Sequence, residues 1–78
     1  MQVIKAMTDK ERELFATFKI AIEAERSAQA MYQKAVDLCE EPALKSILIG
    51  FYDDEVRHEK EVSARYLQYK AEFGIESA

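Results

Sequence analysis

The chain has 78 residues, of which 49% are hydrophobic and 33% are charged, and it contains only two glycines and one proline. This composition suits long amphipathic helices and argues against a disordered chain or a turn-rich β fold. The net charge of −4 disfavours nucleic acid and anionic membranes as partners. Because so small a domain buries too little surface to carry several buried charges alone, we expect a partner subunit or a metal ion to stabilise it.

Two further features of the sequence indicate where in the cell the protein is located. Cys39 is the only cysteine, which excludes an intrachain disulfide and metal sites built from cysteine pairs. Residues 1–7 are too short and too polar for a signal peptide, and no apolar run approaches the roughly 20 residues of a membrane span. We therefore expect a soluble protein of the cytoplasm.

Local signals predict an all-α hairpin. A capping box over residues 8–11, Thr-Asp-Lys-Glu, starts the first helix. Pro42 breaks the pattern and opens the second helix, and Gly74 is suited to stop it. A connection this short requires the two helices to pack antiparallel. The predicted organisation is an N-terminal arm over residues 1–8, a hairpin over 9–73 with helices at about 9–40 and 42–73, and a C-terminal tail over 74–78.

One seam of alternating four- and three-residue steps runs along each predicted helix. Further apolar residues widen the arc of the first helix, which therefore needs more than one neighbour. Gly50 lies inside the second helix, where we expect it to mark a close contact between helices. The first seam comprises Leu14, Phe18, Ala21, Glu25, Ala28, Tyr32, Ala35 and Cys39, and the second comprises Leu44, Leu48, Phe51, Glu55, His58 and Val62, continuing through Tyr66, Tyr69 and Phe73.

Three polar residues interrupt these seams at one height. In a hairpin that turns near residue 41, positions whose numbers sum to about 82 lie level, so Glu55 and His58 bracket Glu25. A buried carboxylate without a partner costs several kcal/mol, and no lysine or arginine lies on the seams nearby. A divalent metal would neutralise both carboxylates, and carboxylate oxygens with one imidazole suit Fe(II) or Mn(II).

The spacing of Glu55 and His58 is weak evidence when taken alone. With eleven glutamates in 78 residues, chance places one three residues before the single histidine about one time in seven. The seam positions of both residues and the facing Glu25 favour a metal site over a polar layer in a metal-free bundle. The acidic residues Asp53, Asp54, Glu59 and Glu61 are interpreted as a solvated face.

The order Glu25, Tyr32 and Asp54-Glu55-Val56-Arg57-His58 resembles the first half of the ferritin-like di-iron bundle of rubrerythrins, over about residues 15–62. The resemblance implies that Glu25 is a terminal ligand, Glu55 a bridging carboxylate and His58 an imidazole ligand. It also implies that Tyr32 is a hydrogen-bonding group behind the ligands. An ordinary packing role for Tyr32 is equally consistent with its position, and Cys39 is interpreted as a small packing residue rather than a ligand.

The family bundle has four helices, whereas this chain supplies two. It is therefore closer to the half-size encapsulated ferritins, whose dimers assemble the iron site between chains. The resemblance implies a homodimer with two iron or manganese ions per dimer, open to higher assembly and to enclosure in an encapsulin shell, although no targeting tail is recognisable after Gly74. The expected function is a ferroxidase that oxidises Fe(II) with O₂ or peroxide for storage or detoxification. The alternatives are a rubrerythrin-like peroxide reductase and a metal-free helical interaction module.

Overall fold

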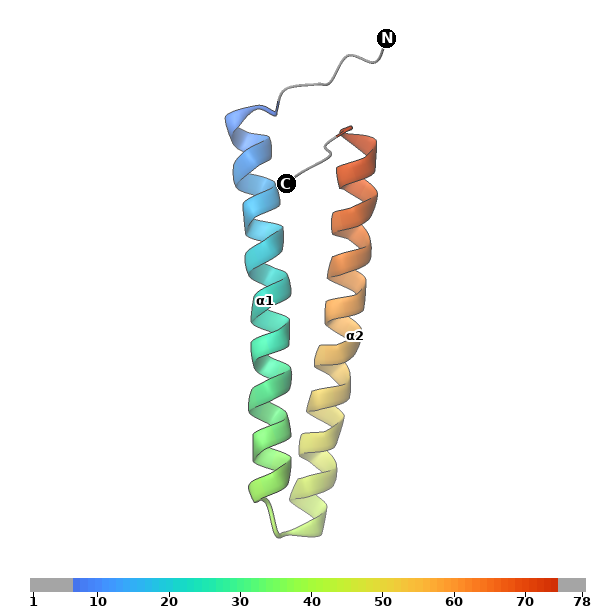
Figure 1. Ribbon diagram of the computed structural model, residues 1–78. Helices are drawn as coiled ribbons and strands as arrows, with labels where there is room; N and C mark the ends of the chain where they lie inside the picture. The colour runs from blue at the N-terminus through green and yellow to red at the C-terminus, as the bar shows by residue number, and fades with distance from the viewer. Residues whose placement is uncertain (1–6, 75–78) are drawn as a thin grey trace.

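The computed structural model describes residues 7–74 as two long antiparallel helices, α1 (Asp9–Leu38) and α2 (Pro42–Glu72). Figure 1 shows them lying side by side, with the start of α1 and the end of α2 together at the end opposite the turn. The predicted all-α hairpin is confirmed. Most of the predicted arm and tail lies outside the described residues. None of the described helices is long and apolar enough to cross a membrane.

The helix ends follow local chemistry. The predicted capping box is present: Thr8 Oγ1 accepts from the Glu11 amide at 3.1 Å, and the Glu11 carboxylate accepts from the Thr8 amide at 3.4 Å. Glu41 caps α2 by accepting from the amides of Ala43 and Leu44. Gly74 adopts a φ of 68°, the left-handed conformation that favours glycine after a helix.

The end of α1 departs from the prediction. The helix stops at Leu38, not at about residue 40, and Cys39 has an extended backbone with φ −83° and ψ 125°. Residue 41 is also extended, as expected of a residue before proline. The chain needs these non-helical residues to reverse its direction between two helices that pack against each other. The helix α1 therefore ends two residues before the predicted position.

Aromatic packing closes the open end of the hairpin. Phe15 is 1% exposed and is the only fully buried side chain among residues 7–74. Its ring makes edge-to-face contacts with two aromatic rings. The distance between ring centroids is 5.9 Å to Tyr66 and 5.7 Å to Phe73. Nearer the turn, Tyr32 packs on Phe51 at 5.6 Å. The pairs Phe15–Tyr66 and Tyr32–Phe51 lie within one position of the predicted register, whereas Phe15–Phe73 lies six positions from it.

Much apolar surface stays uncovered. The radius of gyration is 17.3 Å, whereas a compact domain of this length has about 11.5 Å. The prediction for Gly50 is wrong within this hairpin, because a Cβ there would meet nothing within 4 Å. The exposed large apolar side chains are Leu14, Ile20, Met31, Leu38, Leu44, Ile47, Ile49, Phe51, Leu67 and Tyr69.

Candidate metal centre

The hairpin brings Glu25, Glu55 and His58 together at its middle. Glu25 comes from α1, while Glu55 and His58 lie one turn apart on α2, where three-residue spacing puts both on one face. One ligand atom from each residue lies within 4.8 Å of the others. His58 Nδ1 is 3.7 Å from Oε2 of Glu25 and 3.7 Å from Oε2 of Glu55. The sequence therefore placed these three side chains correctly relative to one another.

The three side chains are half-buried, and this differs from the deep burial expected of the middle of two seams. The exposed fractions are 22% for Glu25, 21% for Glu55 and 43% for His58. A two-helix hairpin covers only one side of the seam, so water reaches the other side. Oε2 of Glu25 is the exception: it is buried and accepts no hydrogen bond. A buried oxygen without a donor is a site where a cation would be favourable.

The neighbours of Glu25 raise its pKa above the ordinary value of a glutamate. The largest cause is a side-chain hydrogen bond with Glu55, followed by loss of water around the carboxyl group. The negative charges of Glu55 and Glu59 act in the same direction, and His58 opposes them. Two carboxylates in contact cannot both ionise cheaply without a cation between them. The cluster therefore lacks a positive charge that would allow both carboxylates to ionise.

The three donors fit a transition-metal ion. With bonds of about 2.1 Å, an octahedral ion holds neighbouring ligand atoms about 3.0 Å apart and opposite ones about 4.2 Å apart. The two separations of 3.7 Å from His58 Nδ1 lie between these two values, so small side-chain rotations are needed to bring the three atoms to octahedral positions. Two carboxylate oxygens and one imidazole nitrogen match the preferences of Fe(II) and Mn(II). The buried Oε2 of Glu25 is a candidate ligand atom that receives no hydrogen bond from residues 7–74.

Without metal, the protein is expected to become less stable as the pH rises through the raised pKa of Glu25. The folded state binds more protons than the unfolded state here, so this contribution is fully present below the unfolded pKa and is lost above the folded one. Glu25→Gln should thus be more stable than wild type at pH 7 and equal to it at pH 4. Urea unfolding followed by circular dichroism with a chelator present measures this difference.

The matched control for that experiment is Glu13→Gln, which changes an exposed glutamate elsewhere on α1. It should show no such pH-dependent gain. A Glu25→Gln protein that is less stable than wild type at pH 7 without metal would contradict the prediction.

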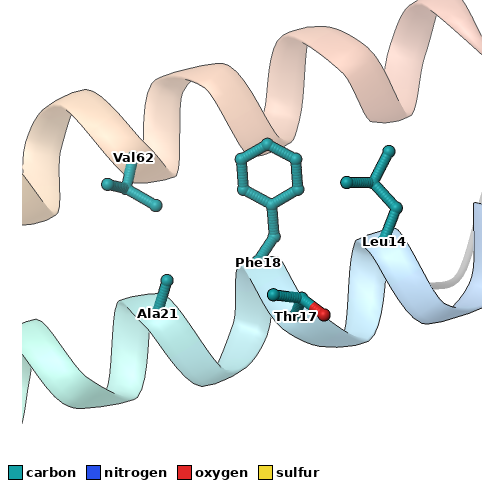
Figure 2. A pocket seen from close by; sticks show the side chains of 5 residues that line it. All are labelled: Leu14, Thr17, Phe18, Ala21 and Val62. Atoms are coloured by element: carbon teal, nitrogen blue, oxygen red, sulfur yellow. The ribbon is translucent and has the colours of Figure 1, made fainter.

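A shallow apolar hollow of about 270 Å³ continues along the face that carries the site. Figure 2 shows Val62 of α2 above Ala21 and Phe18 of α1, with Leu14 and Thr17 completing the wall. Ala21 lies one turn before Glu25, and Val62 lies one turn after His58, so the hollow and the three ligands share a face. This face is apolar on one side of the ligands and open to solvent.

The other two residues considered from sequence lie apart from the ligand cluster. Tyr32 packs its ring on Phe51, and no hydrogen bond joins its hydroxyl to the three ligands in the hairpin as described over residues 7–74. Its interpretation as a group behind the ligands stays a prediction. Cys39 is half-buried at the turn, where its thiol donates to the Glu41 carbonyl at 3.4 Å.

Glu59 is the residue that sequence reasoning missed. The sequence predicts a solvated acidic position for it, but its side chain is only 26% exposed and pairs with Arg26 of α1. Gln29 Nε2 donates to its Oε1 at 2.7 Å, and Arg26 Nε donates to its Oε2 at 3.4 Å. The register rule gave no signal for this contact, because the numbers 59 and 29 sum to 88 rather than to about 82.

Neither a protein-family model, a curated protein nor a solved structure matches this chain at a significant level.

Proposed function

We propose that this protein is a di-iron ferroxidase whose site is completed between two copies of the hairpin. The observation that carries the proposal is the convergence of Glu25, Glu55 and His58 around a buried carboxylate oxygen that has no donor. Two such sets around a two-fold axis would provide four carboxylates and two imidazoles for two ions, the ligand set of ferritin-like di-iron bundles.

The surface of the hairpin supports a second copy as its partner. The chain exposes 6030 Å², whereas a folded protein of 9.0 kDa exposes about 4,900 Å². The excess of roughly 1,100 Å² is comparable with the 800 Å² or so that each partner contributes to a standard interface. Leu14 and Phe51, which share the ligand-bearing face by their helical spacing, are each 46% exposed. Covering this face would also remove water from the three ligands.

Each ligand residue has a defined part in this proposal. Glu25 offers its unpartnered Oε2, Glu55 offers a carboxylate within reach of the same ion, and His58 offers Nδ1 in its neutral form. The raised pKa of Glu25 favours its protonated form, with which a cation must compete, so binding should weaken at acid pH. When bound, the pair of ions supplies the electrons that reduce O₂ or peroxide as Fe(II) becomes Fe(III).

Anaerobic loading with Fe(II) is expected to yield one iron per chain and a particle with the mass of two chains. A chelator should remove the iron and lower both the melting temperature and the dimer fraction, because metal that binds only the assembled state stabilises it by mass action. At a free iron concentration 100 times the dissociation constant, the gain is about 2.7 kcal/mol per site. Elemental analysis, light scattering and thermal melts measure these quantities.

The same preparation distinguishes the alternatives. Oxidation of the loaded protein by O₂ at a rate comparable with that by peroxide is expected of a ferroxidase. Oxidation that is far faster with hydrogen peroxide than with O₂ would instead identify a peroxide reductase. Fewer than one iron per chain, with a dimer that is indifferent to chelators, would identify a metal-free interaction module and refute the proposal.

A further inference from the structure

Glu59 joins the two helices beside the metal centre but outside its ligand cluster. It follows His58 on α2, and its two carboxylate oxygens accept from Gln29 at 2.7 Å and from Arg26 at 3.4 Å on α1. Arg26 is held in turn by Glu23 at 3.3 Å. We call the trio of Glu59, Gln29 and Arg26 the latch.

The latch lies at the same height as the ligands. Arg26 is the residue after Glu25, and Gln29 lies one turn beyond Glu25 on α1. Glu59 is the residue after His58, so a single turn of each helix carries both a ligand and a member of the latch. Sliding of α1 along α2 that lengthens the latch contacts therefore also changes the distances from Glu25 to Glu55 and His58.

On the ligand-bearing face of α1, the apolar side chains next to Glu25 are small. The fully buried ring, Phe15, lies near the open end, and the residues one turn from Glu25 on the ligand-bearing face are Ala21 and Ala28. Small side chains interlock weakly, and a slip of one turn displaces a helix by about 5.4 Å. A metal site tolerates only a few tenths of an ångström in its ligand distances. Directional polar contacts between helices are a known means of fixing register.

We propose that the latch positions the metal ligands: Glu59, held by Gln29 and Arg26, sets the register at which Glu25 meets Glu55 and His58. Its link to metal rests on the proposed function, but the register is a property of the hairpin alone. The latch residues are positioning residues and not ligands.

The first test measures register without metal. In a Cys39→Ser background, spin labels at Lys19→Cys and Asp53→Cys occupy exposed positions that are offset along the hairpin, so sliding changes their separation. A single narrow distance distribution is expected with the latch intact, and a broadened or shifted one with Gln29→Leu or Glu59→Leu. The exchange Gln29→Glu with Glu59→Gln, which reverses donor and acceptor, should restore the narrow distribution.

Measuring the stability of the same variants shows whether a lost register comes from unfolding or from the loss of the latch contacts. Leucine at position 59 removes a half-buried charge and adds apolar surface, so Glu59→Leu should keep the helix content and melting temperature of the parent while losing the register. Glu61→Leu, at an exposed position of α2, is the matched control and should leave the distance distribution unchanged. An unchanged distribution in both latch variants would overturn the inference.

The second test measures metal. Gln29→Leu and Glu59→Leu should each weaken Fe(II) binding about tenfold or more in anaerobic calorimetry, and the charge exchange should recover it. Wild-type affinity in both variants would overturn the positioning role while leaving the proposed iron site intact. Absence of Fe(II) binding in the parent, with latch-dependent register, would refute the proposed function and leave the latch standing.

Discussion

Replacing Glu55 or His58 by alanine is expected to lower the affinity for Fe(II) at least 100-fold, because each variant loses one of the three proposed ligands that residues 7–74 bring together. Changes to groups that merely support metal ligands already cost about 10- to 100-fold. Oxidation of Fe(II) should fall with binding. Anaerobic titration calorimetry measures the affinity, and stopped-flow absorption measures the oxidation rate.

Conservative variants sharpen this experiment. Glu25→Gln and Glu55→Gln keep the shape of the side chain and remove the charge that a cation requires, so both should lose iron as the alanine variants do. Glu61→Ala, which changes an exposed glutamate of the same helix, should bind iron like wild type. Iron binding that survives both Glu55→Ala and His58→Ala would place the metal elsewhere and refute the assigned site.

Replacing Phe15 by alanine is expected to destabilise the hairpin by about 3–5 kcal/mol, the usual cost of emptying a buried phenylalanine site. Phe15 is 1% exposed and is the ring around which Phe18, Tyr66 and Phe73 gather, with centroids 5.7–6.2 Å away. A hairpin of this size has little stability to spare. Most of the metal-free variant should therefore be unfolded, as measured by circular dichroism across a urea series.

Leu67→Ala provides the comparison for Phe15→Ala. Leu67 is 62% exposed on α2, so its truncation should change the free energy of unfolding by no more than about 0.5 kcal/mol. Equal effects of the two substitutions would show that the aromatic cluster is not where the stability of the hairpin resides.

The fold followed from local signals in the sequence. The capping box at Thr8, the proline at 42 and the glycine at 74 each act through the backbone of their own turn, so their effects did not depend on distant residues. The spacing of apolar residues then set the faces that meet, and the short turn set the approximate height at which Glu25 faces Glu55 and His58, leaving the final register to side-chain contacts between the helices. Periodicity and connection length are sufficient for a hairpin because it has only one way to close.

The tertiary structure decided what the periodic pattern could not express. Helical spacing could not show that Glu59 turns from the solvated face toward Gln29, because that depends on a side-chain contact between positions 30 residues apart. It could not show that the ligands stay half-exposed, since exposure depends on how many neighbours cover the seam. The sequence by itself determined two helices and the height of the three proposed ligands. Only the packed hairpin decided which carboxylate oxygen is buried without a donor, because burial arises from atoms of both helices together.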